Sequence, residues 1–164
     1  YQAAEAYQLP LTWLRAGDAV AIDGEARFAV LGPLRKDDEI ENNNSLVLLL
    51  ETAQGTALFP GDMELGEEAD LLESGALPRI DVLKVAHHGE DDASGELFLY
   101  TVRPKLAVIP TSTSEEPDTP DPKIIRRLWA VQGETYVTQS ATCGVLVRLE
   151  AGEPEASLVD YDQP

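Results

Sequence analysis

The stretch Asp81-Val82-Leu83-Lys84-Val85-Ala86-His87-His88-Gly89 decides how the rest of the sequence is interpreted. Its mainly apolar first part predicts a buried strand, and two histidines and a glycine follow where that strand would end. A second apolar run, residues 56–59, ends in the same way at Pro60-Gly61-Asp62. Ligand-type side chains thus follow two apolar strands, and strand ends are where α/β folds collect their sites. We therefore expect Asp62 and at least one imidazole to lie within ~5 Å of each other.

Outside these two runs, short apolar stretches alternate with turn residues, which predicts a mixed α/β fold with more strands than helices. The further strands are expected at 19–22, 27–31, 45–50, 106–109, 135–138, 145–149 and 158–159. Helices are expected at 64–74, 96–102 and 123–131, with Gly75 ending the first and Asp121-Pro122 starting the last. The strand at 45–50 is almost entirely apolar, which predicts burial on both of its faces.

The composition limits the function. The chain has 164 residues, 12 Lys and Arg against 30 Asp and Glu, and a net charge of −18. This length suits one domain, and so acidic a surface argues against a conventional DNA-binding module. A single cysteine excludes a disulfide within one chain and a zinc site of the two-CxxC type. Neither a membrane-spanning run nor a signal peptide is recognised, and a start at Tyr1 suggests a piece of a longer protein.

Carboxylate and imidazole groups are suitable ligands for zinc or manganese, so Asp62, His87 and His88 are the candidate metal ligands. The alternative is a turn aspartate beside two solvated histidines. A hydrolytic zinc site needs about three protein ligands, and a two-metal site needs more. The chain has only two histidines, and if both were extended they would face opposite ways. Either the metal is held weakly, or the remaining ligands lie on a segment outside this chain.

Other candidates are weaker. Cys143 is a candidate ligand or nucleophile, but a small buried residue beside a turn is the more frequent role. The hydroxyl residues at 112–114 have no GxSxG motif around them and are interpreted as an acidic loop. The acidic run at 90–92 is interpreted as a solvated surface.

Three stretches carry a resemblance to a known family: Asn43-Asn44-Ser45-Leu46-Val47-Leu48, Phe59-Pro60-Gly61-Asp62 and the run at 81–89. They resemble the C-terminal metallo-β-lactamase-like domain of ComEC, the DNA-internalisation channel protein of bacterial competence. The runs at 104–109 and 133–138 fill the places of two later motifs. The resemblance covers about residues 11–149, so that residues 1–164 would be the C-terminal portion of one such domain.

The resemblance implies an α/β fold that is part of an αββα sandwich, with mixed sheets and flanking helices. It also implies a metal-dependent nuclease that cleaves the DNA strand that does not enter the cell, with zinc or manganese activating water. Asp62 matches the family's G-D aspartate, and His87 and His88 match its paired histidines, leaving open which histidine faces the metal. Asp62 and His88 are the catalytic candidates. The implied partners are single-stranded DNA and the rest of a multi-pass membrane channel, with this part soluble, extramembrane and extracytoplasmic.

The sequence departs from the family pattern at three points. The H-x-x-x-D-H signature is absent and would lie upstream of Tyr1, Thr119 stands where a histidine is expected, and Glu90 replaces a serine. We therefore expect this chain alone to bind zinc or manganese weakly or not at all, and not to cleave DNA. The alternative is a domain that has lost catalysis and serves as a structural or DNA-guiding part of the channel. A small-molecule hydrolase on the same fold is a third hypothesis, without a pocket motif to support it. Apolar strands lacking part of a sandwich also predict a homodimer.

Overall fold

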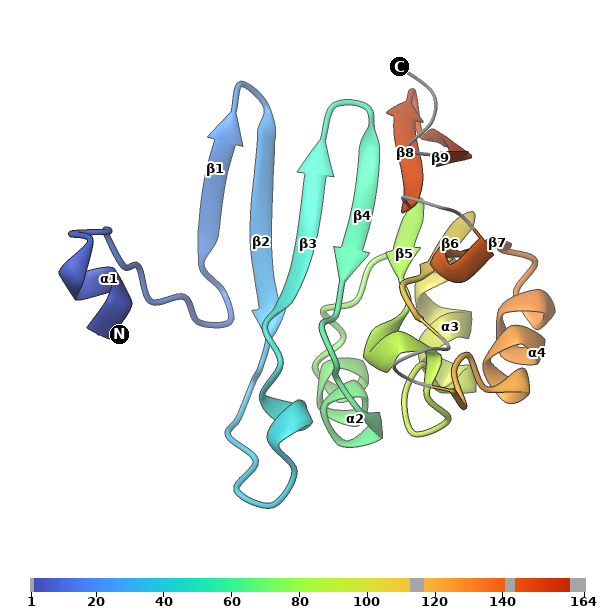
Figure 1. The fold of residues 1–164 in the computed structure, drawn as a ribbon, viewed down its shortest axis with the longest axis horizontal. Coiled ribbons are helices and arrows are strands. Elements are labelled where there is room, and N and C mark those ends of the chain that lie inside the picture. The colour runs from blue at the N-terminus through green and yellow to red at the C-terminus, as the bar shows by residue number, and fades with distance from the viewer. Residues whose placement is uncertain (1, 113–116, 141–143, 160–164) are drawn as a thin grey trace.

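The structure, a computed structural model, describes residues 2–112, 117–140 and 144–159. It confirms a mixed α/β fold built on one seven-stranded sheet with flanking helices, and a separate two-stranded hairpin (Figure 1). The strands of the large sheet are β1 (Ala19–Asp23), β2 (Ala26–Gly32), β3 (Val47–Thr52), β4 (Gly55–Phe59), β5 (Val82–Lys84), β6 (Leu106–Ile109) and β7 (Glu134–Val137). The hairpin pairs β8 (Gly144–Glu150) with β9 (Glu153–Val159). The α-helices are α1 (Gln2–Ala6), α2 (Leu65–Ser74), α3 (Glu96–Val102) and α4 (Pro122–Ala130).

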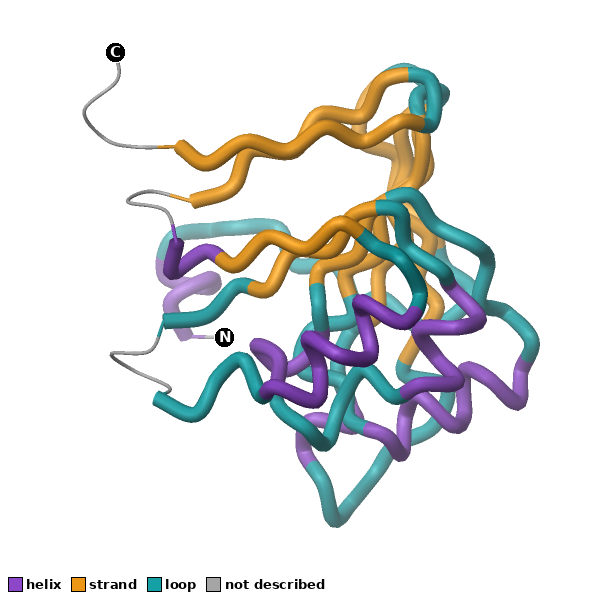
Figure 2. The backbone as a smooth tube through the Cα atoms, turned by 90° about the vertical axis from the view of Figure 1, so that its right-hand side faces the viewer, coloured by secondary structure: helices purple, strands orange, loops and turns teal. Residues whose placement is uncertain are grey.

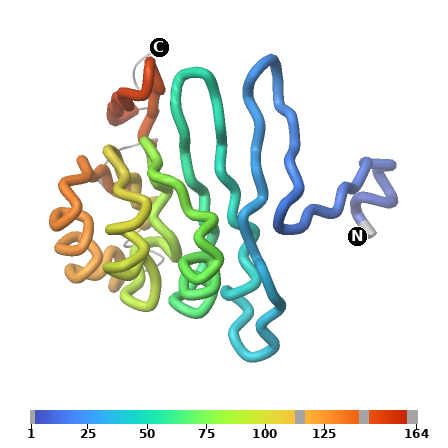
Figure 3. Tube along the Cα trace, turned by 180° about the vertical axis from the view of Figure 1, so that it is seen from behind, coloured from blue at the N-terminus to red at the C-terminus, as the bar shows by residue number. Residues whose placement is uncertain are grey.

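The strands follow one another across the sheet in chain order. Strands β1 to β4 are antiparallel neighbours, whereas β4 to β7 run parallel and are connected through α2, α3 and α4. Parallel crossovers are almost always right-handed, so three crossovers that advance in the same direction place their helices on the same face. Figures 2 and 3 show these helices together on one face, with the hairpin on the other side of the sheet.

The main core lies between the helices and the sheet. Fully buried side chains from the helices, such as Leu71, Phe98 and Leu128, pack there against Leu49 and Leu83 of the sheet. This packing of an apolar helix stripe on a sheet is the main stabilising term for such a fold. Within the described residues, no helix is long and apolar enough to cross a membrane.

The opposite face of the sheet is covered only in part. The hairpin covers it from β4 to β6, where Val147, Leu149 and Ala156 pack on Ala57, Val82 and Leu106. The strand at β5 is therefore buried on both faces, as predicted. Burial of residues 45–50 on both faces is wrong, because the side of β3 away from the helices is only half-buried and Leu46 is 40% exposed.

The ends of the elements show which local signals the sequence carries. Helix α2 ends at Gly75 in the left-handed conformation, with φ 68°, and the Asp121 carboxylate caps α4 by accepting from the Lys123 N–H. The expected strand at 81–86 ends two residues early, because Ala86–Gly89 forms a 3₁₀ turn. The short strand expected at 158–159 is the end of the longer β9, and the helix α1 was not expected.

Candidate functional site

Two turns at the carboxyl ends of the parallel neighbours β4 and β5 build the site. After β4, Gly61 has φ +65°, a conformation that favours glycine, and the Asp62 N–H donates to Ser45 Oγ over 3.1 Å. After β5, the His87 N–H donates to the Gly61 carbonyl over 3.3 Å, and Lys84 Nζ donates to the same carbonyl over 2.7 Å. These bonds join the two turns, and the expected convergence of Asp62 with the histidine run is confirmed.

The backbone of the histidine run is left-handed at three consecutive residues, with φ of 44° at His87, 53° at His88 and 88° at Gly89. Non-glycine residues occupy this region at a cost of roughly 1–3 kcal/mol each, so the surrounding structure has to hold the turn in place. The run is therefore not extended, and the two imidazoles reach different partners. His88 faces Asp62, whereas His87 faces Asp92.

His88 is oriented as metal-binding histidines usually are. Its Nδ1 lies 2.6 Å from the carbonyl oxygen of Pro110, which can only accept, so Nδ1 carries the proton. In the neutral ring, Nε2 then presents a lone pair, and it lies 3.4 Å from Oδ1 of Asp62. Two ligands of one tetrahedral zinc ion are separated by about 3.4 Å when the bonds are near 2.1 Å. Nε2 of neutral His88 and Oδ1 of Asp62 are both hydrogen-bond acceptors, so at this distance they are stable only with a positive charge between them. A bound cation or a second proton on His88 would supply that charge.

Lys84 supplies part of that positive charge. Its Nζ lies 3.5 Å from Oδ1 of Asp62. Its side chain is about three-quarters buried, whereas the carboxylate of Asp62 is 44% exposed. Asp62 and His88 therefore fit a divalent cation by chemistry and spacing, with Lys84 as a competing partner for the same carboxylate.

A second group of ligand-type side chains surrounds His87. One ligand atom each from Glu64, His87 and Asp92 lies within 4.8 Å of the others. His87 Nδ1 is 3.0 Å from Asp92 Oδ1, and Asn42 Nδ2 lies 3.3 Å from His87 Nε2 and 2.9 Å from Glu64 Oε1. If Asn42 donates to Nε2, then Nδ1 donates to Asp92, and both ring nitrogens have partners without an ion.

Sequence reasoning missed Glu64 and Asp92. The run at 90–92 was interpreted as a solvated surface, but Asp92 contacts His87 and its backbone carbonyl accepts from the Leu65 N–H over 3.0 Å. Asp91 also differs from a solvated acid, because it bonds Lys123 and Arg127. A signal for Glu64 was present, since it follows Asp62 by two residues and precedes α2 directly.

Two charged side chains hold the loop that carries Asp92. The buried carboxylate of Glu68 accepts from the Gly95 N–H over 2.9 Å, and burial raises the pKa of Glu68 to about 7. Arg127 of α4 donates to the carbonyls of Asp91 and Ala93, each over 3.1 Å, and to the Asp91 carboxylate over 2.9 Å. The position of Asp92 beside His87 thus depends on both α2 and α4.

The chain is similar to curated bacterial proteins that are much longer than it is. It is 32% identical over 127 residues to "ComE operon protein 3" of Bacillus subtilis, a match that covers 77% of this chain and 16% of that protein. It is 34% identical over 82 residues to "Recombination protein 2" of Haemophilus influenzae, covering 50% of this chain and 10% of that protein. The chain is ComEC-like. No family model matches it, and it spans about a sixth and a tenth of the lengths of these two relatives.

One departure of this ComEC-like chain from the family pattern has a structural counterpart. Thr119, which stands where a histidine is expected, is 2% exposed, and its hydroxyl is hydrogen-bonded to that of Thr111. The next residue, Pro120, lies against Gly89, and the Asp121 N–H donates to the Gly89 carbonyl over 2.9 Å. Position 119 is thus close in sequence to residues that contact the histidine turn, but it holds a buried hydroxyl in place of an imidazole. Cys143 lies outside the described residues.

Proposed function

We propose that this ComEC-like chain belongs to a bacterial DNA-uptake channel and that Asp62 and His88 bind a divalent cation, zinc or manganese, for phosphodiester hydrolysis. We further propose that the hydrolysis acts on the DNA strand that is not taken up. In this proposal the chain is the C-terminal portion of a metallo-β-lactamase-like domain, best matched at residues 11–149. The channel is a multi-pass membrane protein, and this portion lies outside the membrane on the extracytoplasmic side.

One observation carries the proposal: Nε2 of His88 and the Asp62 carboxylate face each other at 3.4 Å, while Nδ1 of His88 lies 2.6 Å from the Pro110 carbonyl oxygen. The distance suits two ligands of one ion and is longer than a good hydrogen bond. The histidine is also fixed through its other nitrogen, which is the usual arrangement around a metal. The identity to the two relatives supports the choice of DNA as the substrate class.

The chain's own residues have separable roles in this proposal. Asp62 and His88 would hold the cation, which would supply Lewis acidity and an activated water when bound. The Pro110 carbonyl keeps Nε2 of His88 directed at Asp62. Lys84, 3.5 Å from the same carboxylate, offers a positive charge for a phosphate oxygen. A hydrolytic site needs about three protein ligands, so we expect weak binding and no cleavage by this chain alone.

The second candidate is a domain without catalysis that guides DNA or supports the channel. Two observations favour it. The buried hydroxyl of Thr119 replaces an imidazole, and hydroxyl groups are not among the usual zinc ligands. Lys84 already places an ammonium group near Asp62, which reduces the need for a bound cation there. In this case the charge balance around Asp62 would serve the fold.

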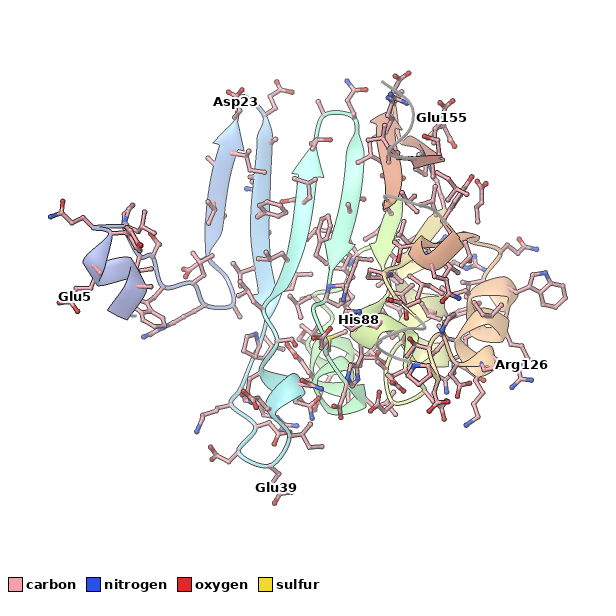
Figure 4. All side chains as sticks on the ribbon, viewed as in Figure 1. Glu5, Asp23, Glu39, His88, Arg126 and Glu155 are labelled. Atoms are coloured by element: carbon pink, nitrogen blue, oxygen red, sulfur yellow. The ribbon has the colours of Figure 1, made fainter. Side chains whose placement is uncertain are left out.

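The test uses the longer protein that the relatives lead us to expect, with 5′-labelled single-stranded DNA and Mn²⁺. Asp62→Asn and His88→Gln should each reduce cleavage by about 100-fold or more, because each removes a ligand. Asp23→Asn is the matched control, since Asp23 lies at the far end of the β1–β2 hairpin from His88 (Figure 4). Bound but uncleaved DNA with both Mn²⁺ and Zn²⁺ would contradict the nuclease proposal and support the guiding domain.

A further inference from the structure

The positive charges of this acidic chain are unevenly distributed. Six of its twelve Lys and Arg residues line two adjoining hollows on the helix side of the molecule, which meet at Ala130 and Val131. The volumes of these hollows are about 800 and about 480 Å³. Of the acidic residues that the structure describes, only Glu96 and Asp81 line them. We call this surface the basic groove and define it by Arg79, Arg103, Lys105, Lys123, Arg126 and Arg127.

Three of these charges have no carboxylate at salt-bridge distance among the described residues, and one of the three, Arg103, lies over the ring of Tyr100. The other two, Arg79 and Arg126, are both exposed. Arg126 extends from α4 at the edge of the molecule (Figure 4). The charges of Lys123 and Arg127 are partly balanced by Asp91. In a chain of net charge −18, unbalanced arginines gathered on one surface indicate a polyanionic ligand.

Exposed aromatic rings adjoin the same charges. Tyr100 on α3 is 63% exposed and lines the larger hollow, and Arg103 lies 5.0 Å from the centre of its ring. Trp129 on α4 is 81% exposed and lines a neighbouring hollow, which shares Ala130 with the two hollows of the basic groove. Aromatic faces beside cations are the combination that binds single strands, because bases stack on the rings while phosphates meet the cations.

We propose that the basic groove binds single-stranded DNA, with phosphates on Arg126 and Arg79 and bases stacked on Tyr100 and Trp129. The choice of DNA as the polyanion rests on the proposed function. The surrounding negative charge repels a polyanion elsewhere on the surface, which confines binding to this groove. An acidic protein segment would use the arginines but gives no comparable reason for two exposed rings.

The groove adjoins the candidate site through one loop. Lys123 and Arg127 both bond Asp91, and the next residue, Asp92, contacts His87. Single-stranded DNA held in the groove would therefore contact α4 on one side of the Asp91–Asp92 loop. The histidine turn lies on the other side of that loop. The groove would serve to keep the strand close to Asp62 and His88.

The test is fluorescence anisotropy of a labelled oligothymidylate of about 20 nucleotides with the 164-residue chain in EDTA. Two phosphate contacts give a slope of log affinity against log salt near −1.4, and Arg126→Ala should bring it to about −0.7. Trp129→Ala should weaken binding by about 5- to 150-fold through lost stacking. Arg148→Ala and Trp13→Ala are matched controls, since they remove an exposed arginine and an exposed tryptophan that line neither the groove nor the hollow beside it.

Equal effects of Arg126→Ala and Arg148→Ala, or no effect of Trp129→Ala, would overturn the proposal. So would displacement of the oligonucleotide by poly-glutamate at equal charge concentration, which would indicate an acidic protein ligand. Because the measurement is made in EDTA, the outcome does not depend on the cation site. Binding of the oligonucleotide in EDTA together with no cleavage in Mn²⁺ would support the groove and contradict the hydrolysis proposal, so the two failures remain distinguishable.

Discussion

Glu67 makes the stability of this fold depend on pH. Its side chain on α2 is 2% exposed, and neither carboxylate oxygen has a hydrogen-bond partner among the described residues. Oε1 lies so close to Gly32 that a Cβ there would be 2.5 Å from it. Burial raises the pKa of Glu67 from 4.5 to about 8, because a charged carboxylate is poorly solvated there; the backbone of Ser45 opposes this rise, and the charge of Asp70 adds to it.

The sign of the effect follows from proton binding. Below pH 4.5 the carboxyl is protonated in both the folded and the unfolded chain, whereas between pH 4.5 and about 8 only the folded chain keeps the proton. The free energy of unfolding therefore falls as the pH rises through this window. At 1.36 kcal/mol for each pKa unit, the fall from this residue is on the order of 5 kcal/mol.

Glu67→Gln should remove this dependence, since glutamine keeps the shape of the side chain and does not ionise. We expect the stability of the variant relative to the unchanged chain to rise between about pH 5 and about pH 9 by several kcal/mol. Urea unfolding followed by circular dichroism measures this difference, with Glu73→Gln, an exposed acid on the same helix, as the control. A difference that stays constant over this range would refute the reasoning, because it would mean that Glu67 ionises equally in both states.

Two further predictions concern the histidine turn and the open face of the sheet. Gly89→Ala should destabilise the fold by about 1–3 kcal/mol, because φ is +88° and the new Cβ would lie 2.9 Å from Cβ of Pro120. Urea unfolding measures this loss of stability. An unchanged free energy of unfolding would contradict the description of the turn. Copies of the chain should associate through the partly exposed apolar face that includes Val20 and Phe59, more strongly as salt screens the charge of −18. Sedimentation showing a compact monomer at high salt would contradict this second prediction.

The strands and helices were largely predictable because their signals are local. Gly75 ends α2 and Asp121-Pro122 starts α4 as the sequence indicates, since a left-handed C-terminal glycine and an N-cap need no tertiary information. The half-exposed side of β3 could not be predicted from the sequence. Leucine at positions 48 and 50 suits a side of the sheet that another layer covers, and the sequence does not show that this layer is missing there.

The site was predictable in part. Asp62 and His88 follow neighbouring parallel strands, so their meeting follows from topology. The separation of His87 from His88 depends on two consecutive left-handed residues, and this conformation is uncommon for any single residue other than glycine, so a run of two is not expected from the sequence. The contact of Asp92 with His87 depends on Glu68 and Arg127, which hold its loop from distant elements, and a single sequence does not reveal such packing.

The central claim is that the Asp62–His88 pair attracts a cation, and long-range ¹H–¹⁵N NMR of the imidazole rings tests it most directly. The chain has only two histidines, so both rings can be assigned with His87→Gln. We predict that at neutral pH Nδ1 of His88 is protonated and that Zn²⁺ shifts its Nε2 resonance, with a response at least about tenfold weaker in Asp62→Asn. An Nε2 resonance of His88 that does not move at saturating Zn²⁺, while His87 responds, would contradict the claim.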